Sequence, residues 1–475
     1  MDELERLALA VQLPAFEGTT WDADAWRLLE EGLGGVCLFG SNTTGGPDQI
    51  AELCGQVRAR AEHAVIAIDE EGGDVTRLHY HHGSPVPGNA VLGHLDDPDL
   101  TRRAAASIAS ELAAVGVNLN FAPVADVNTA SANPVIGIRS FSSDAGVAAR
   151  HVRAYIEGLQ AFGVGSCAKH FPGHGSTITD SHLTVPLVEA SLEVLRGRDL
   201  VPFVAAVEAG VDAVMTSHIL VPALDPDHVS TLSSRVLGML RTELGFTGTI
   251  VTDALDMAGA SRGRGVPAAA VLALAAGADL LCLGADKDPA LVRATQRAIV
   301  DAVRAGALSV ERLTDAAASV AGLAVPLVGA PVVPLTSRQA IDAARAALTI
   351  EGELPELVDP LWCRVDTPAS IAVGGVPWGV ATRHVIDAGD PALGLSELLL
   401  HTRGRTVIVQ VRDAQRVPGF EGIMRAMQAV SPLVIVEYGW PAPAGPGLPA
   451  RVLTYGGSAA SAAAVADWVA DGGRP

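Results

Sequence analysis

Short runs of apolar residues alternate with longer segments of helical periodicity over roughly the first 325 residues of the chain. Eight of these runs have the length and composition of buried strands. They are residues 7–12, 35–39, 65–69, 117–121, 166–170, 213–217, 249–253 and 280–283. Helical patterns lie between them, at residues 51–63, 100–115, 147–162, 191–209 and 289–305. Eight strands with intervening helices predict a parallel sheet closed into a (β/α)8 TIM barrel.

A change of pattern after the barrel predicts a second domain. Residues 324–334 are apolar and rich in proline, and a helical segment follows at about residues 336–348. Further strand-like runs occur at residues 406–411, 433–437 and 451–454, and a helical pattern closes the chain at 459–469. We therefore expect a barrel over residues 1–330, a linker over 331–345 and a smaller α/β, sandwich-like domain over 346–475.

The turn Gly456-Gly457-Ser458, which precedes the last helix, has two interpretations. Such a turn can bind an anion at a helix N-terminus, although in α/β folds it usually only reverses the chain.

The composition narrows the possible partners. The 475-residue chain has a formal net charge of -20, which disfavours nucleic acid and anionic membranes, since both attract clustered cations. No apolar run approaches the roughly 20 residues of a membrane span. The N-terminus has no cationic start of the secretory kind, and five scattered cysteines suggest neither disulfides nor a zinc cluster. We expect a cytoplasmic protein without a cofactor.

Polar residues follow several predicted strands, and the active site of a TIM barrel lies at those strand ends. The densest group is Lys169-His170-Phe171-Pro172-Gly173-His174-Gly175, followed by Asp180-Ser181-His182. Proline and glycine predict a loop from which these side chains project into one pocket. The histidine spacing also allows a metal site, but the nearby lysine would repel a divalent cation, so we expect no metal. These histidines could also be surface or core side chains whose hydrogen bonds are satisfied within the protein and that have no part in binding or catalysis.

Two further patches end strands. The stretch from Asp69 to Leu78 combines four carboxylates with a double glycine and Arg77, which suits recognition of a polyhydroxylated ligand. An exposed charged turn is the plain alternative. The strand that ends at Asp253 places a carboxylate where a glycosidase nucleophile could sit, although Asp253 or Thr252 could equally be a helix N-cap.

Taken together and in this order, these stretches resemble glycoside hydrolase family 3, and specifically its bacterial β-N-acetylhexosaminidase branch that acts in cell-wall recycling. The resemblance covers most of the first 330 residues. Besides the three patches it includes Gly34 to Phe39, Asn120 to Val127, Asn133 to Ser142 and Leu240 to Gly248.

The resemblance implies a retaining β-N-acetylglucosaminidase in which Asp253 attacks the anomeric carbon and water then hydrolyses the glycosyl-enzyme. It assigns His182 as the acid/base, with Asp180 as its partner. It also assigns the binding of the terminal N-acetylglucosamine to the side chains of Asp69, Arg77, Arg139, Lys169 and His170. At two positions this chain departs from the family pattern: Glu70 stands where glutamine is usual, and Asp74 where a basic or polar residue is common. We expect both to add negative charge beside the sugar.

Three alternatives remain open at this point. An imidazole acid/base would not repel phosphate, so a phosphorylase is possible. A β-glucosidase and a sugar-binding barrel without activity are the others. The natural glycan, its leaving group and the oligomeric state cannot be derived from the sequence.

Overall fold

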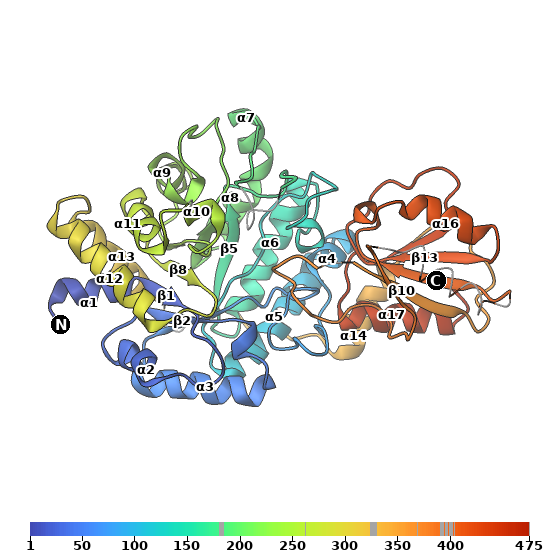
Figure 1. The fold of residues 1–475 in the computed structure, drawn as a ribbon, viewed down its shortest axis with the longest axis horizontal. Helices are drawn as coiled ribbons and strands as arrows, with labels where there is room; N and C mark the ends of the chain where they lie inside the picture. Colours follow the sequence, from blue (N-terminus) through green and yellow to red (C-terminus); the bar gives the residue numbers. More distant parts are fainter. Residues whose placement is uncertain are drawn as a thin grey trace.

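The computed structural model describes the chain except residues 180–184, 262, 324–329, 368, 390–393, 395–397, 399–401, 403 and 475. The chain forms two lobes that lie side by side, with the N-terminus at the far end of the larger lobe (Figure 1). No strand pairs across the two lobes among the described residues. The two lobes correspond to the two domains that the apolar pattern predicts.

The larger lobe is built around eight parallel strands. They are β1 (Gln12–Pro14), β2 (Gly35–Leu38), β3 (Val65–Ile68), β4 (Leu119–Asn120), β5 (Gly165–Phe171), β6 (Ala213–Thr216), β7 (Thr249–Val251) and β8 (Leu281–Gly284). Strands β2 to β7 pair in chain order, β1 pairs with β8, and a bridge from Val251 to Leu280 joins β7 to the start of β8. The sheet therefore curls into the predicted TIM barrel.

Alternation along the strands separates two apolar layers. Val65 and Ala67 of β3 face the inside of the barrel, whereas Ile66 and Ile68 pack outward under the helices. The surrounding segments are α1 (Glu3–Ala10), α2 (Ala23–Glu30), α3 (Gly46–Arg60), α4 (Asn89–Leu95), α5 (Pro98–Val115), α6 (Ala145–Gln160), α7 (Leu192–Val194), α8 (Val201–Glu208), α9 (Ser234–Thr242), α10 (Ala258–Ser261), α11 (Val266–Ala276), α12 (Pro289–Arg304) and α13 (Val310–Leu323). One π-helical turn, Leu195–Asp199, joins α7 to α8. Burial on both faces explains why the strands have apolar runs.

The first predicted strand, residues 7–12, is mostly wrong. Helix α1 extends to Ala10, and β1 begins only at Gln12. The cause is a capping box, in which Asp2 Oδ1 accepts from the amide of Glu5 at 2.8 Å and Glu5 Oε2 accepts from the amide of Asp2 at 2.8 Å. This cap starts a helix whose apolar residues pack on α12 and α13.

The second lobe is a six-stranded sheet covered by helices on both faces. Its strands are β9 (Thr349–Glu351), β10 (Leu361–Asp366), β11 (Val385–Asp387), β12 (Val407–Val411), β13 (Leu433–Glu437) and β14 (Ala450–Leu453). The order is β11-β10-β12-β13-β14-β9, and only β9 is antiparallel to its neighbour. Helix α16 (Phe420–Gln428) packs on one face, and α17 (Ala459–Ala470) on the other. Strands β12, β13 and β14 match the predicted runs.

Helix α14 (Ser337–Ala346) matches the helical segment expected at residues 336–348, and all but its last residue lies in the segment predicted as a linker. Its Ala340 and Ala344 pack against Ala460 and Ala464 of α17, so the helix is part of the second lobe. Just before this helix, the amide of Leu335 donates to Ser107 Oγ of α5 in the barrel, at 2.8 Å. The exact division into 1–330, 331–345 and 346–475 stays a prediction.

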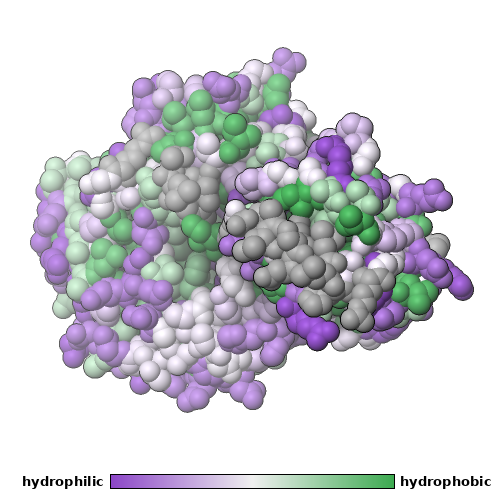
Figure 2. Space-filling view, turned by 45° about the vertical axis from the view of Figure 1, so that its right-hand side comes forward, coloured by the Kyte–Doolittle hydropathy of each residue, from purple (hydrophilic) through white to green (hydrophobic). Residues whose placement is uncertain are grey.

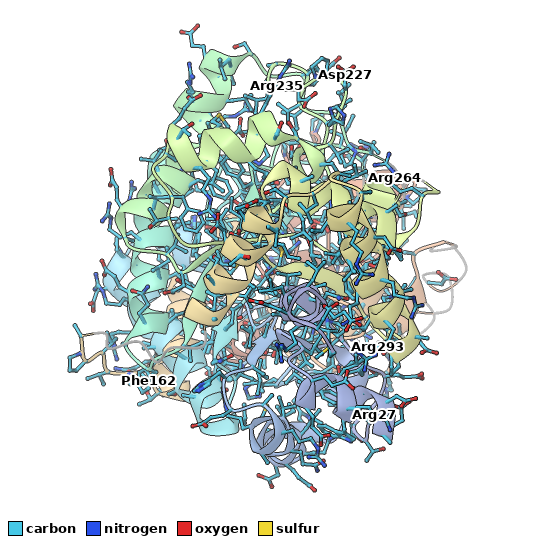
Figure 3. The ribbon with its side chains drawn as sticks, turned by 90° about the vertical axis from the view of Figure 1, so that its left-hand side faces the viewer. Arg27, Phe162, Asp227, Arg235, Arg264 and Arg293 are labelled. Atoms are coloured by element: carbon cyan, nitrogen blue, oxygen red, sulfur yellow. The ribbon has the colours of Figure 1, made fainter. Side chains whose placement is uncertain are left out.

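None of the helices within the described ranges is both long and apolar enough to cross a membrane. On the face shown in Figure 2, apolar residues form separate patches among polar ones. Charged side chains such as Arg27, Asp227 and Arg235 project from the periphery of the barrel (Figure 3). All five cysteines are buried and unpaired.

A buried carboxylate joins the two lobes. Asp74, on the loop after β3, accepts from Arg412 Nη1 at 3.1 Å and from the amide of Gly457 at 2.6 Å. The side chains of Asp74 and Arg412 are 3% and 6% exposed. The turn before α17 thus binds an anion, as one interpretation of the sequence proposed, and this anion is the carboxylate of Asp74 from the barrel. Asp74 contacts the second domain rather than the sugar pocket, contrary to the expectation from sequence.

We predict that Asp74→Asn lowers the free energy of unfolding by about 3–5 kcal/mol, because it leaves Arg412 buried without its counter-charge. Urea denaturation measures this. The matched control is Asp24→Asn, which breaks the exposed pair between Arg27 and Asp24 and should cost less than about 1 kcal/mol. Equal losses in the two variants would contradict the role of the buried pair.

Candidate active site

A cavity of about 480 Å³ opens at the carboxyl ends of the barrel strands. Its lining residues come from the ends of the strands, from the segment after β7 and from a loop of the second domain. They are Phe39, Asp69, Glu71, Val75, Phe121, Val135, Arg139, Lys169, His170, His174, Met215, Asp253, Ala254, Asp256, Met257, Ala258, Ser261, Cys282, Ala285, Ile371 and Ala372. This is the position at which TIM barrels carry their active sites.

Lys169 lies on the pocket floor between two carboxylates. Its Nζ is 2.6 Å from Asp69 Oδ1 and 2.6 Å from Glu71 Oε1, and its side chain is only 2% exposed. Burial lowers the pKa of a lysine, but Asp69 and Glu71 outweigh this effect and raise the pKa of Lys169 above its usual value. Lys169 is therefore a fixed cation on the pocket floor.

Glu71 connects this cation to a second one. Arg139 donates to Glu71 twice, from Nε at 2.9 Å and from Nη2 at 2.7 Å. Burial by itself would raise the pKa of Glu71, but Arg139 and Lys169 hold it well below the usual range. Two carboxylates and two cations thus form a neutral cluster of Asp69, Glu71, Arg139 and Lys169, which we call the floor cluster.

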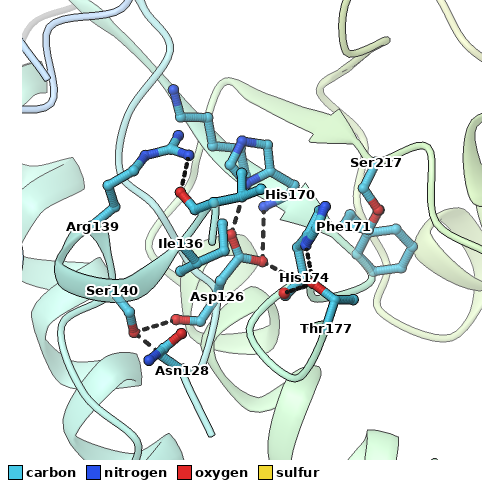
Figure 4. A network of polar contacts seen from close by, with 12 residues as sticks. Asp126, Asn128, Ile136, Arg139, Ser140, His170, Phe171, His174, Thr177 and Ser217 are labelled. Atoms are coloured by element: carbon cyan, nitrogen blue, oxygen red, sulfur yellow. Dashed lines mark hydrogen bonds and ion pairs between the residues drawn. The ribbon is translucent and has the colours of Figure 1, made fainter. Parts of the chain in front are cut away.

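His170 is held by a second buried carboxylate, Asp126 (Figure 4). The ring Nδ1 of His170 lies 2.7 Å from Asp126 Oδ2, and Asp126 Oδ1 accepts from the amide of His174 at 2.6 Å. Burial acts to raise the pKa of Asp126, but the charge of His170 and its hydrogen bond lower it overall. Because Nδ1 faces Asp126 and the ring lines the cavity, Nε2 is the ring nitrogen that can contact a ligand.

Strand geometry alone would not place Lys169 and His170 on the same wall, since neighbouring residues of a strand point to opposite faces. The register of β5 with β6 shifts between Lys169 and Phe171. This irregularity redirects the chain at His170, and both side chains line the cavity.

Asp253 follows β7 and lines the same cavity. Its Oδ1 accepts from the amide of Ala254 at 2.7 Å. The carbonyl of Ala254 is in turn 2.9 Å from Nε2 of the buried His218, whose Nδ1 lies 2.8 Å from Thr231 Oγ1. His218 therefore helps to fix the backbone beside Asp253.

The structure brings together five of the eight predicted site residues on the cavity wall: Asp69, Arg139, Lys169, His170 and Asp253. Arg77 lies behind the wall, with its guanidinium 5.4 Å from the ring of Phe39 and its Nη2 donating to the carbonyl of Ala372 at 2.8 Å. Asp180 and His182 lie outside the described residues.

Glu70 does not face the cavity, contrary to the expectation from sequence. Its Oε2 accepts from the amides of Arg77 and Leu78, at 2.7 and 2.9 Å. Burial raises the pKa of Glu70. The residue therefore closes the loop after β3 and adds no charge beside a sugar.

Glu71, Asp126 and His174 are site residues whose roles the sequence did not reveal, although all three stand in the motifs. Adjacent carboxylates such as Asp69, Glu70 and Glu71 cannot be told apart until the loop is folded. No sequence pattern predicted that Ile371 and Ala372 line the cavity, because they come from the other domain. Within the described part of the chain, no group of three or more His, Cys, Asp or Glu side chains could hold a metal ion.

His174 yields a prediction about pH. Burial lowers the pKa of His174 to about 4, and its Nε2 has no hydrogen-bond partner in the described structure. In the unfolded chain a histidine titrates near pH 6.5. Above that pH the ring is neutral in both states. As pH falls from about 6.5 to about 4, only the unfolded chain gains the proton, and stability falls by up to about 1.4 kcal/mol per pH unit.

We expect His174→Gln to reduce this loss of stability, measured by urea denaturation between pH 7 and pH 4. His63→Gln, at an exposed histidine, is the control and should leave the pH dependence unchanged. Identical slopes for the wild type and His174→Gln would show that His174 is not held neutral.

Comparison with known proteins identifies the family of the chain. The family described as "Glycosyl hydrolase family 3 N terminal domain" matches residues 10–323. The chain is 38% identical over 261 residues to a β-hexosaminidase of Xanthomonas campestris pv. campestris (strain B100), a match that covers 54% of this chain and 78% of the relative.

Solved structures show the same relation. A glycoside hydrolase family 3 β-N-acetylglucosaminidase from Paenibacillus sp. superposes with a TM-score of 0.89 at 30% identity, over 99% of this chain and 97% of that one. A β-glucoside phosphorylase superposes with a TM-score of 0.77 at 19% identity, over 99% and 91%, which shows a shared fold alone. This chain belongs to glycoside hydrolase family 3, and it is a glycoside hydrolase.

Proposed function

We propose that the protein is a retaining β-N-acetylglucosaminidase that removes terminal, non-reducing N-acetylglucosamine through a covalent intermediate on Asp253. The observation that carries this proposal is the position of Asp253 on the wall of the cavity that contains the floor cluster. A carboxylate beside buried hydrogen-bonding groups suits attack on the anomeric carbon of a bound sugar. The name of the Paenibacillus relative supports the N-acetylated sugar, and the name of the Xanthomonas relative supports a hexosaminide.

Binding of the sugar precedes the chemistry. Asp69 is the most accessible acid of the floor cluster, at 16% exposure, and its carboxylate can accept hydrogen bonds from two hydroxyl groups. Lys169 and Nε2 of His170 supply further polar contacts. Since these groups are fixed by Glu71 and Asp126, the pocket needs little rearrangement when the sugar binds.

The reaction then proceeds in two steps. An Asp253 oxygen forms a bond to the anomeric carbon while the bond to the leaving oxygen breaks, and the leaving oxygen receives a proton. Water next attacks the same carbon, gives up a proton and releases Asp253. His182, with Asp180 as its partner, is our proposal for the group that gives and then takes the proton. This assignment follows the resemblance of the Asp-Ser-His motif.

We also propose that the enzyme works on muropeptides in the cytoplasm, in cell-wall recycling. The resemblance to the bacterial branch of the family supports the muropeptide substrate, and five unpaired cysteines fit a reducing compartment. Accumulation of N-acetylglucosamine-containing muropeptides in cells that lack the protein tests it.

Substrate class and acceptor are tested together by a panel of nitrophenyl glycosides. We expect N-acetylglucosaminides to be cleaved faster than glucosides, and the free sugar to be released whether or not phosphate is present. Faster cleavage of glucosides would overturn the substrate assignment. Formation of a sugar 1-phosphate would identify a phosphorylase instead.

Asp253→Asn should reduce hydrolysis by about a thousand-fold or more, because the nucleophile is lost. In the wild type, a fluorinated glycoside with a leaving group good enough to form the intermediate should add the mass of one sugar to the protein. Asp227→Asn, at an exposed aspartate away from the pocket, is the control and should behave as wild type. An adduct that forms on the Asp253→Asn variant would place the nucleophile elsewhere.

The floor cluster gives a prediction that separates binding from folding. Asp69→Asn should lower kcat/KM roughly ten- to hundred-fold, since a hydrogen bond to a charged group contributes about 1.5–3 kcal/mol. It should lower the free energy of unfolding less than Glu71→Gln does, because Lys169 keeps its contact with Glu71 and Asp69 is partly exposed. Glu71→Gln should lower both activity and, by about 3–5 kcal/mol, the free energy of unfolding. Equal effects of the two variants on urea denaturation would contradict these separate roles.

A further inference from the structure

The catalytic cavity has a buried floor and an exposed mouth. Glu71, Arg139 and Lys169 are almost fully buried, whereas Asp256 and Ala258 on the same lining are exposed. A terminal sugar places its hydroxyls against the buried polar groups. The leaving group of that sugar must then lie toward the mouth, where solvent and the rest of the substrate have room.

Ile371 is the large apolar side chain at this mouth. It is 58% exposed, yet it lines the cavity. A single exposed isoleucine carries no meaning by itself, and others of similar exposure, such as Val430 at 61%, occur elsewhere on the second lobe. What distinguishes Ile371 is that it also lines the cavity, at whose mouth the leaving group must lie.

The loop that carries Ile371 is bound to the barrel by two hydrogen bonds that follow Ile371 in the chain. The neighbouring carbonyl of Ala372 accepts from Arg77 at 2.8 Å, and the amide of Gly375 donates to Tyr80 Oη at 3.0 Å. Val373 of the same loop packs in an apolar cluster with Val75 of the barrel. These contacts hold the backbone next to Ile371 beside the pocket.

We propose that Ile371 is a specificity-determining residue that packs against the leaving group of the substrate. It favours leaving groups with an apolar face, such as an aromatic ring or the C–H face of a pyranose, over small ones. This inference rests on the proposed glycosidase function, and it assigns the second domain a direct contact with substrate. Burial of apolar surface between Ile371 and the leaving group supplies the preference.

The test compares two β-N-acetylglucosaminides that differ only in the leaving group, the 4-nitrophenyl and the methyl glycoside. In Ile371→Ser we expect kcat/KM for the 4-nitrophenyl glycoside to fall about tenfold, with KM rising more than kcat falls, and kcat/KM for the methyl glycoside to stay within about twofold. Ile371→Leu should restore most of the loss, because it restores the apolar surface. Val430→Ser, at a valine of similar exposure in the same domain, should leave both substrates unchanged.

An equal change for the two glycosides, or no change for either, would overturn the role of Ile371. Unfolding is not expected to confuse the result, since the side chain is mostly exposed and urea denaturation can verify stability. If the wild type prefers a sugar other than N-acetylglucosamine, the proposed function is wrong, but the role of Ile371 can still be tested. The same pair of leaving groups on that sugar then decides the role of Ile371.

Discussion

The site depends on the neutralisation of Lys169 inside the barrel. A buried ammonium group is costly unless it is paired, and Asp69 and Glu71 pair with it at 2.6 Å each. Two carboxylates need a further cation, and Arg139 supplies it through two hydrogen bonds to Glu71. Each member of the floor cluster is thus held in place by another. Together the four side chains have no net charge, and they present fixed polar groups to a ligand.

The second domain is part of this arrangement. Asp74 stands three residues after Glu71 on the same loop. It accepts hydrogen bonds from Arg412 and from the amide of Gly457, in the turn before α17. Arg77, at the other end of the loop, is bound by the carbonyl of Ala372. The loop that carries Asp69 and Glu71 is therefore anchored to the second domain at two points. A barrel without that domain would have to hold the loop by other means.

The sequence predicted the barrel well because parallel strands buried on both faces leave continuous apolar runs, as in β3 and β6. It missed the start of the barrel, since the capping box of α1 overrides an apolar run at residues 7–12. In the second domain, the edge strands β9 and β11 are short and partly exposed, so they have no such run.

The pocket was predicted less completely than the fold. Strand ends pointed to Asp69, Lys169, His170 and Asp253, because the barrel gathers all strand ends at one mouth. The orientation of a side chain on a loop has no such rule. Glu70 and Asp74 were therefore expected beside the sugar, although of Glu70, Glu71 and Asp74 only Glu71 lines the cavity. Contacts from Ile371 and Ala372 depend on how two domains pack, which no local pattern encodes.

The most direct test of this account is a crystal structure of the Asp253→Asn variant with an intact N-acetylglucosaminide. We expect the terminal sugar to contact Asp69, Lys169 and His170, with its anomeric carbon about 3–3.5 Å from the side chain at position 253. A sugar that binds in the cavity with its anomeric carbon facing away from position 253, or one that binds outside the cavity, would contradict the account.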